Sequence, residues 1–251
     1  MRFDVCAHTY DEHAGPQRFF AERVAQFISA RSTENILELG AGTGALTQHL
    51  TGAPSSSSAS FARAELELCA PIFATDASPT MVELGRVSVP EAQWSVLDAF
   101  NQPLPVAALQ VSSGLLHWAA DPAAMLARWK TFLTPGGRMV HAIPCEPCLN
   151  EWRALVPESP VPWRNEAEWL KIFERAGLRV TRSQSWTHNA ICASALEMVR
   201  GFHRTGVTGR VRVGPARLRQ ALREYDARHR VPGGVQATWA WLAVEGVEKL
   251  R

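Results

Sequence analysis

The sequence lacks a long apolar run, a disulfide framework and a secretion signal. Only 5 of its 251 residues are cysteines, an odd number without the regular spacing of a disulfide scaffold. No uninterrupted apolar run approaches the roughly 20 residues that a membrane-spanning helix needs. The first residues, Met1 to Asp4, are charged and contain no apolar stretch of the kind that begins a signal peptide. These features predict a cytoplasmic protein with reduced thiols and no membrane partner.

A strong net charge is also missing. The formal charge of +2 excludes the basic balance that is typical of nucleic-acid-binding domains. One stretch departs from this neutrality. Residues 200–230 contain an excess of arginine, and the acids among them are Glu224 and Asp226. Such an excess suits an acidic protein partner, and it is equally consistent with a solvated helix face. The arginines are Arg200, Arg204, Arg210, Arg212, Arg217, Arg219, Arg223, Arg228 and Arg230.

The most informative motif begins with the apolar residues that follow Asn35 and continues into three alternate glycines, Gly40, Gly42 and Gly44. Glycine lets the backbone approach a ligand closely, and a helix that starts there offers free N–H groups. The spacing alone also fits a dinucleotide-binding turn. However, Glu38 places a negative charge beside the turn, which favours a cationic ligand over a pyrophosphate. The segment therefore predicts a turn that binds a positively charged nucleoside.

Two further acids end the next predicted strands. Asp76 closes the apolar segment 71–76, where a carboxylate accepts hydrogen bonds from both ribose hydroxyls. Asp98 closes the segment 93–98, where the adenine amino group of a nucleoside lying across the strand ends would arrive. The alternative is that each acid only caps a helix. Taken together, the three acidic strand ends predict one nucleoside site along a single sheet edge.

This series of strand ends resembles the class I S-adenosylmethionine-dependent methyltransferases, and residues 76–81 resemble the segment that follows the second strand in that family. The resemblance implies an α/β fold, with a Rossmann-like sheet of seven strands and helices on both faces. It also implies S-adenosyl-L-methionine as the cofactor, without a metal. The cofactor-binding residues that it implies are Glu38, Gly40, Gly42, Gly44, Asp76, Ala77, Met81, Asp98, Ala99 and Ser112.

Hydrophobic periodicity predicts the rest of a single domain over residues 1–251, with an N-terminal helical cap (1–34) and a cofactor-binding half (35–145). A Ser-rich segment, 52–58, lengthens the interval between Gly40 and Asp76 beyond the ~20 residues expected after such a turn. Two helices within 190–234 exceed the needs of the minimal sheet and are candidates for a substrate lid. The expected strands are 35–39, 71–76, 93–98, 106–116, 133–140, 178–185 and 236–246, and the expected helices include 18–30, 44–50, 61–69, 81–86, 122–133 and 166–176.

Two groups of potentially reactive side chains lie outside these motifs. His117 follows the fourth predicted strand and is either a general base or a wall residue of the pocket. Its neighbour Trp118 belongs to the pocket or the core. Cys145 and Cys148 have C-x-x-C spacing, but a structural zinc site normally needs four ligands and the second pair is missing.

A narrower resemblance rests on the segment Phe3 to Gln17, on the pair His117-Trp118 and on Ala195 to Gly206. These are similar to segments of the malonyl-acyl-carrier-protein O-methyltransferases of biotin synthesis. The resemblance implies that the acceptor is the free carboxylate of a malonyl thioester, and that acidic acyl carrier protein is the partner. A carboxylate is ionised at neutral pH and needs no general base. The candidate catalytic residues are Tyr10, which either closes over the methyl group or only docks its helix, Arg200, which orients the carboxylate, and His117, where the family is expected to have glutamine.

Two other functions stay open at this point. The chain could methylate another small acceptor, such as a quinone or a phenol, in which case His117 would matter more than Arg200. It could also bind adenosylmethionine without transferring its methyl group, and act as a partner module through its arginines.

Overall fold

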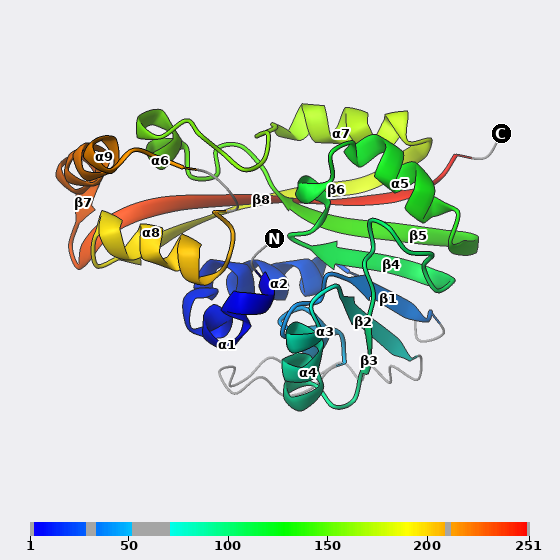
Figure 1. The fold of residues 1–251 in the computed structure, drawn as a ribbon. Helices are drawn as coiled ribbons and strands as arrows, with labels where there is room; N and C mark the ends of the chain where they lie inside the picture. Colours follow the sequence, from blue (N-terminus) through cyan, green and yellow to red (C-terminus); the bar gives the residue numbers. More distant parts are fainter. Residues whose placement is uncertain (1–2, 29–33, 52–70, 209–211, 250–251) are drawn as a thin grey trace.

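The computed structural model describes residues 3–28, 34–51, 71–208 and 212–249. The Ser-rich segment 52–58, the helix expected over 61–69 and Arg210 lie outside these ranges. The described strands form one sheet in the order β3-β2-β1-β4-β5-β8-β6, with β7 paired to β8 (Figure 1). Their bounds are β1 (Ile36–Leu39), β2 (Ile72–Asp76), β3 (Gln93–Val96), β4 (Ala107–Ser113), β5 (Leu133–Pro144), β6 (Leu178–Cys192), β7 (Arg230–Val231) and β8 (Gly234–Glu248).

The direction of the strands decides where a site can form. Strands β1 to β5 are mutually parallel, and β8 runs antiparallel between β5 and β6. The carboxyl ends of the five parallel strands therefore share one edge, where open α/β sheets bind ligands. This topology confirms the expected methyltransferase-like sheet. It adds the two-residue strand β7, and β6 continues to Cys192 instead of ending at Ser185.

Helices cover both faces of the sheet, as the resemblance implied. Alternate residues of β1 point to opposite faces: Ile36 joins the cluster beneath α2 and α4, whereas Leu37 joins the cluster beneath α5 and α7. Asp121 caps α5 as expected, accepting hydrogen bonds from the N–H groups of Ala123 and Ala124. The helices in these two layers are α2 (Gly15–Phe27), α3 (Thr47–Leu50), α4 (Pro79–Ser88), α5 (Pro122–Lys130) and α7 (Glu166–Arg175).

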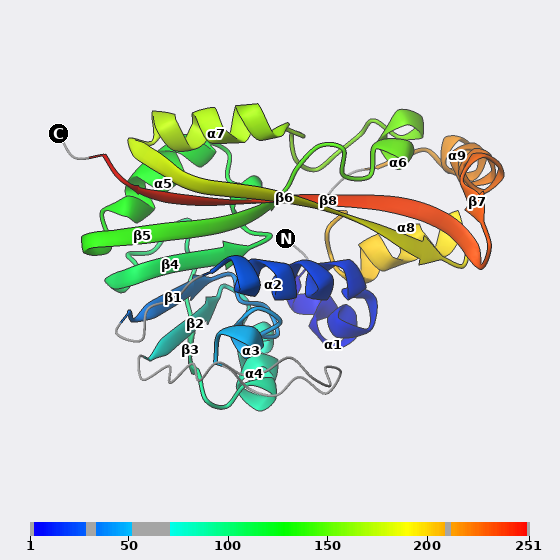
Figure 2. The same ribbon diagram turned by 180° about the vertical axis from the view of Figure 1, so that it is seen from behind.

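A third group of helices surrounds the part of the β6–β8 hairpin that projects past the parallel strands. Figures 1 and 2 show α6 (Asn150–Leu155), α8 (Ala195–Arg204) and α9 (Pro215–Arg228) at this end of the molecule, with α1 (Phe3–His13) close to α8. Helices α8 and α9 are the two that the sequence placed within 190–234. Since residues 190–192 belong to β6, the added segment begins after Cys192. A separate hydrophobic cluster that includes Trp152, Phe202 and Tyr225 joins these helices to β8.

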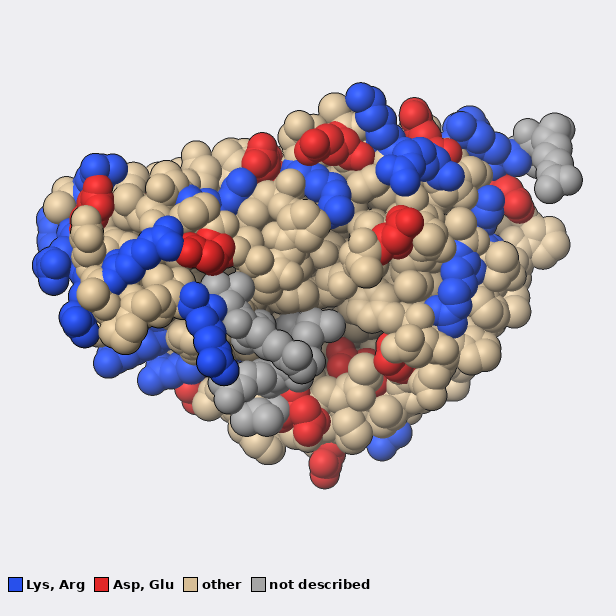
Figure 3. Space-filling model, turned by 45° about the horizontal axis from the view of Figure 1, so that its top comes forward, with Lys and Arg blue, Asp and Glu red and all other residues tan. Residues whose placement is uncertain are grey.

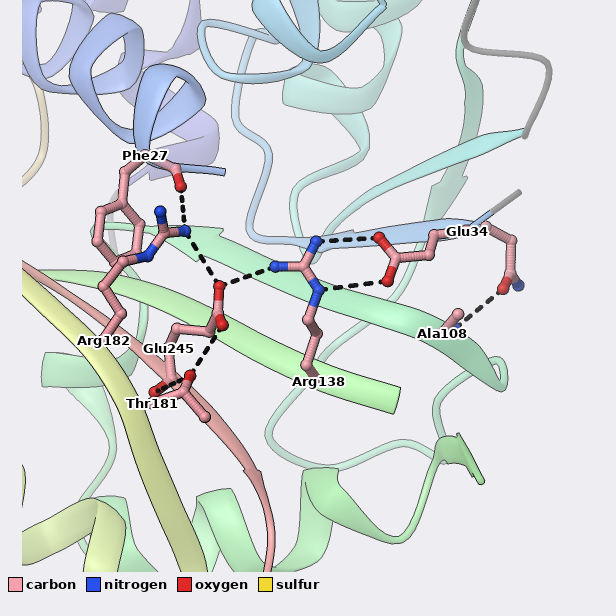
Figure 4. Close-up of polar contacts among 8 residues, drawn as sticks. Phe27, Glu34, Ala108, Arg138, Thr181, Arg182 and Glu245 are labelled. Carbon is pink, nitrogen blue, oxygen red and sulfur yellow. Dashed lines mark hydrogen bonds and ion pairs between the residues drawn. The ribbon is translucent and has the colours of Figure 1, made fainter. Parts of the chain in front are cut away.

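At the amino end of the parallel strands, an ion-pair network ties the sheet together (Figure 4). The Arg138 guanidinium donates to both carboxylate oxygens of Glu34 (3.3 and 2.9 Å) and to Glu245 at 2.8 Å. Glu245 also pairs with Arg182 at 3.1 Å and accepts from the hydroxyl of Thr181 at 2.8 Å. This network links the segment before β1 to β5, β8 and β6, at the edge opposite to the expected site.

No helix in the described part of the chain combines the length and apolar character that a membrane crossing requires.

Candidate functional site

The glycine turn after β1 makes a cradle that only glycine can form. Gly40 has φ +66°, and a Cβ there would lie 3.0 Å from the Leu115 side chain. Gly42 has φ +58°, and a Cβ there would meet nothing within 4 Å. Residues with a side chain rarely adopt these angles. The backbone of the turn therefore borders an open space with no side chain in between. A ligand that is held closely requires such an approach.

Glu38 lies under this turn and is only 2% exposed. Its carboxylate accepts a hydrogen bond of 2.7 Å from the hydroxyl of Thr47, and its backbone carbonyl accepts one of 2.7 Å from Thr75. Burial raises the pKa of Glu38 to about 8, although the Thr47 hydrogen bond acts in the opposite direction. A buried carboxyl in this state gains most from a nearby positive charge. The site therefore fits a ligand with a sulfonium and an ammonium group.

Asp76 and Asp98 differ in what their carboxylates hold. Asp76 accepts from the backbone N–H of Gly42 at 3.0 Å and of Ser78 at 2.9 Å, so it connects the ends of β1 and β2. Burial raises the pKa of Asp76 against the effect of these hydrogen bonds. Asp98 accepts only from its own turn, from the N–H of Phe100 (2.9 Å) and the amide of Asn101 (2.7 Å). Asp98 therefore closes a turn and not a helix, whereas Asp76 links two strand ends, so the alternative that each acid only caps a helix describes neither.

Helix α1 closes over this edge of the sheet. Its first turn is held by Asp4, which accepts a 2.6 Å hydrogen bond from Ser78, and its last turn by Asp11, which accepts one of 2.6 Å from Thr43. Tyr10 lies between these attachments, and its pKa is raised by burial and by the nearby Asp76 and Asp11 carboxylates. A hydroxyl in such surroundings stays protonated and acts as a hydrogen-bond donor. Helix α1 also bonds to α8, since the Thr9 hydroxyl donates to a backbone carbonyl there.

A cavity of about 500 Å³ runs from the glycine turn to the helices around the β6–β8 hairpin. We call its first part the donor end, which is lined by Tyr10, Gln17, Glu38, Gly40, Gly42, Ser113, Gly114 and His117. We call its second part the acceptor lobe, which is lined by Cys148, Trp152, Arg153, Glu158, Ser159, Val161, Trp163, Val199, Phe202, His203, Thr208, Arg212, Val213, Leu218 and Trp239. The volume lies within the usual range for small-molecule sites.

The cavity wall brings together the expected site residues Tyr10, Glu38, Gly40, Gly42 and His117. Asp76 stands behind the wall, one hydrogen bond away through Gly42. The other expected cofactor residues do not line this cavity: Gly44 packs against Val89 and Trp94, Ala77 is exposed, Met81 and Ala99 are buried, Asp98 is half-buried, and Ser112 is fully buried with its hydroxyl 2.8 Å from Nδ1 of His141.

Arg200 is not brought to the cavity. It lies on α8, whose residues Val199 and Phe202 line the acceptor lobe, but its own side chain is 53% exposed and pairs with Glu197. The i, i+3 spacing of that pair keeps both charges on the outer face of the helix. The cation that orients an acceptor must therefore be sought among residues on the cavity wall, where the structure places Arg153 and Arg212.

His117 occupies the donor end in surroundings that make it a weak base. It follows β4 in a short 3-10 turn beside Trp118, and its Nδ1 is covered without a hydrogen-bond partner among the described residues. Burial lowers its pKa to about 3. Protonation of the ring is therefore strongly disfavoured. Between the two readings of His117, this environment favours a wall residue.

The two cysteines of the C-x-x-C segment are unreactive in this fold. Both are buried, and burial raises the pKa of Cys145 to about 11 and of Cys148 to about 12. Such thiols remain protonated and are poor nucleophiles and poor metal ligands. In the described ranges, no group of three or more His, Cys, Asp or Glu side chains is placed to hold a metal ion.

Several wall residues were not assigned from the sequence. Asp11 and Gln17 lie within the N-terminal segment that carried the resemblance, so their positions were noticed without a role. Arg153 and Leu149 come from α6 and the turn before it, a short element without a periodic signal. Leu149 has φ +53°, a conformation that is rare for a side chain of this size. Trp241 belongs to the last strand and stacks on a ring of α2, which no local pattern predicts.

Comparisons with known proteins agree with this geometry. The family model described as "Methyltransferase domain" matches residues 10–183. Among solved structures, the YcgJ protein from Bacillus subtilis superposes with a TM-score of 0.65 at 14% identity, covering 93% of this chain and all of that one. At this identity the likeness concerns the fold.

Curated relatives carry two kinds of name. The biotin biosynthesis bifunctional protein BioCD of Bordetella avium is 31% identical over 246 residues, which are 90% of this chain and 48% of that protein. A malonyl-[acyl-carrier protein] O-methyltransferase of Alcanivorax borkumensis is 28% identical over 98% of this chain and 84% of its own length. A trans-aconitate 2-methyltransferase of Mycobacterium ulcerans is 30% identical over 54% of this chain and 45% of its own. The chain spans about half the length of the first and third of these relatives.

Proposed function

The chain belongs to the S-adenosylmethionine-dependent methyltransferases, and from this premise we propose that it esterifies the free carboxylate of a malonyl thioester on acyl carrier protein. The relatives named above support the choice of a carboxylate, because malonyl thioesters and aconitate are both carboxylic acids at neutral pH. The relative that spans most of both chains carries the malonyl name.

The observation that carries the proposal is that His117, Tyr10 and Glu38 at the donor end are poorly suited to remove a proton, while the Asp11 carboxylate on the same wall is held by the Thr43 hydroxyl. His117 has a pKa of about 3 and holds a proton too weakly, whereas the pKa of Tyr10 is raised and its hydroxyl keeps its own proton. Glu38, with a pKa of about 8, is protonated at neutral pH in the free protein, and with a cationic donor bound its carboxylate would be paired with that positive charge. A phenol or alcohol acceptor must lose a proton during methylation. A carboxylate arrives already ionised, so it suits this wall.

S-adenosylmethionine, when bound, supplies an electrophilic methyl group on a sulfonium centre. A carboxylate acceptor would take that methyl group with the electron pair of the carbon–sulfur bond left on sulfur, so the protein would have no proton to remove. The protein's task is alignment and exclusion of water. Gly40, Gly42 and Asp76 position the donor, Glu38 complements its positive charge, and α1 covers the reacting groups with Tyr10.

An anionic acceptor also needs a cation for orientation, and we assign this role to Arg153 instead of Arg200. The Arg153 guanidinium lies on the cavity wall 4.6 Å from the centre of the Trp163 ring. It donates to Glu146 at 2.8 Å and to the backbone carbonyl of Cys148 at 3.3 Å. The ring and these two contacts fix its direction, and because Glu146 is partly exposed, water weakens its ion pair with Arg153. A contact of moderate strength orients the carboxylate. It does not stabilise the negative charge so strongly that methylation, which removes that charge, is slowed.

The carrier protein would approach the arginine-rich end of the molecule, where α9 and β7 lie (Figure 3). Arg217 and Arg228 have acidic partners on the chain itself. Arg219, Arg223 and Arg230 are exposed, and none of them has an acidic partner in the described ranges. Unpaired arginines attract an acidic carrier through long-range electrostatics and are screened by salt. In this scheme α8 and α9 act as the lid over the acceptor lobe.

The proposal is tested by intact-mass spectrometry of carrier protein after incubation with the enzyme and S-adenosylmethionine. Malonyl-carrier should gain the mass of one methylene, and mild base should reverse the gain, because methyl esters are base-labile. Acetyl-carrier, which lacks only the carboxylate, is the control and should not change. Methylation of trans-aconitate or of a phenol in the same assay, with malonyl-carrier unmodified, would reject the proposal.

A further inference from the structure

The acceptor lobe is more apolar than a malonyl group requires. Three tryptophans form much of its wall, Trp152 from α6, Trp163 from the loop that follows, and Trp239 from β8. Phe202 from α8 and Leu218 from α9 complete it. These residues belong to or pack against the third hydrophobic cluster, so the lobe is a space left open inside an apolar cluster. A malonyl group has only one methylene, between two carbonyl carbons, to place against such an apolar wall.

Most polar side chains of the lobe already have partners within the protein, apart from the exposed Arg212 and the Nε1 of Trp163, which is buried without a hydrogen-bond partner among the described residues. Glu158 pairs with Arg217, and the Ser159 hydroxyl donates to the carbonyl of Val161 at 2.7 Å. Nδ1 of His203 lies 3.1 Å from the hydroxyl of Thr208. Arg153 is engaged as described above. A polar ligand body would therefore have to displace existing hydrogen bonds, whereas a hydrocarbon displaces only water.

We propose that the acceptor lobe binds a hydrocarbon chain, so that the enzyme methylates ω-carboxyacyl thioesters longer than malonyl with higher efficiency. This inference rests on the proposed carboxylate chemistry, and the bond changes are the same as for malonyl. The carboxylate stays at the donor end, the added methylenes lie among Trp152, Trp163 and Phe202, and the thioester leads outward past the exposed Arg212. Burial of each methylene contributes about 0.8 kcal/mol. That corresponds to a gain of about three- to fourfold in kcat/KM per added methylene until the lobe is full.

The first experiment measures kcat/KM for a series of ω-carboxyacyl thioesters on one carrier protein, from three to ten carbons. The inference predicts a rise over the first several methylenes, followed by a plateau or fall. A monotonic fall from malonyl onward would overturn it and leave the proposed function standing. Absence of ester on every member of the series, malonyl included, would reject the proposed function itself.

A second measurement reports on the lobe without turnover. Straight-chain acyl thioesters of N-acetylcysteamine carry no carboxylate and accept no methyl group, so they act as inhibitors only. Their inhibition constants against malonyl-carrier should fall with chain length from acetyl to octanoyl, and the tryptophan fluorescence should change in parallel because three tryptophans line the lobe. Constants that do not depend on chain length would contradict a hydrocarbon site.

A matched pair of variants connects both results to the lobe. Val213→Trp fills the lobe from the segment before α9 and should flatten the chain-length profile. Val87→Trp makes the same change on the exposed face of α4, outside the cavity, and should keep the wild-type profile. If the two variants give the same profile, the hydrocarbon binds elsewhere. Leu218→Trp provides a second lobe-filling variant if Val213→Trp lowers the melting temperature, and it should flatten the profile in the same way.

Discussion

The backbone N–H of Gly42 donates a hydrogen bond to Oδ2 of Asp76 over 3.0 Å, and this contact joins the glycine turn after β1 to the end of β2. The N–H of Ser78 holds the other carboxylate oxygen at 2.9 Å. The carboxylate therefore shapes the turn and remains beside the open space that Gly42 lines. Donor binding and turn geometry depend on the same side chain.

We expect Asp76→Ala to lower the affinity for S-adenosylmethionine by at least tenfold, because it removes a ribose acceptor and releases the turn. Asp98→Ala should have a smaller effect, since the Asp98 carboxylate accepts only from Phe100 and Asn101 in its own turn. Isothermal titration calorimetry with the demethylated product S-adenosylhomocysteine measures both. Equal losses for the two variants would show that Asp76 has no special position in the site.

Glu38 predicts a pH dependence of donor binding. Its pKa is about 8 in the free protein and falls when a positive charge is placed beside it, so binding at neutral pH releases a proton. Affinity should therefore rise with pH up to about 8, by no more than tenfold per unit. Calorimetry at pH 7 in buffers of different ionisation enthalpy counts the proton. Glu38→Gln should abolish the release, whereas Glu83→Gln, on the exposed side of α4, should not.

The same carboxyl has the opposite effect on stability. The pKa of Glu38 in the folded protein exceeds its ordinary value of 4.5, so the folded state binds more protons than the unfolded state between that value and about 8. The free energy of unfolding of the free protein should fall as pH rises through this window. Glu38→Gln should reduce this slope in urea titrations, and an unchanged slope would place the pKa of Glu38 near its ordinary value.

Arg153 lines the cavity, whereas Arg200 lies on the outer face of α8, so substitutions at the two positions should have different effects. Arg153→Gln should raise KM for malonyl-carrier by about tenfold or more, because a charge-assisted hydrogen bond is lost. Arg200→Gln, at an exposed site paired with Glu197, should change KM by less than threefold at physiological ionic strength. Affinity for S-adenosylhomocysteine should be unchanged in both. The reverse order of effects would return the orienting role to Arg200.

The buried network at the far edge of the sheet makes a separate prediction about stability. Arg138→Ala leaves Glu34 and Glu245 without their shared partner, and we expect a loss of about 3–5 kcal/mol in the free energy of unfolding. Arg182→Ala removes a 41% exposed side chain and should cost clearly less. Urea denaturation measures both values. Similar losses for the two variants would show that burial does not govern this network.

Much of the fold was predictable because its signals are local. Alternate glycines, acids at strand ends and Asp121 as an N-cap each specify their own neighbourhood, and the resemblance that the first two carry implied the methyltransferase-like sheet. The acceptor side was less predictable, because it depends on tertiary contacts. Arg200 belongs to a basic stretch, yet the rotation of α8 turns its side chain outward. Arg153 faces the cavity only because α6 packs beside the β6–β8 hairpin, which no periodicity in its six residues indicates.

For the three acidic residues as well, the sequence predicted the positions but not the protonation. The sequence predicted that Glu38, Asp76 and Asp98 lie along one edge, and they do. It could not predict that Glu38 is buried enough to hold a proton at neutral pH, since that depends on the covering provided by distant segments. Nor could it predict that the ring of His117 is kept neutral by burial, which decides between base and wall.

The most direct test of the central claim, that the acceptor brings its own negative charge and needs no general base, is the pH dependence of a single turnover. Enzyme saturated with labelled S-adenosylmethionine is mixed with malonyl-carrier between pH 6 and 8, and base-labile methyl ester is followed over time. We predict a rate constant that stays within about twofold across this range, with His117→Gln behaving like the wild type. A rate that rises tenfold per pH unit and disappears in His117→Gln would show general-base catalysis and contradict the account.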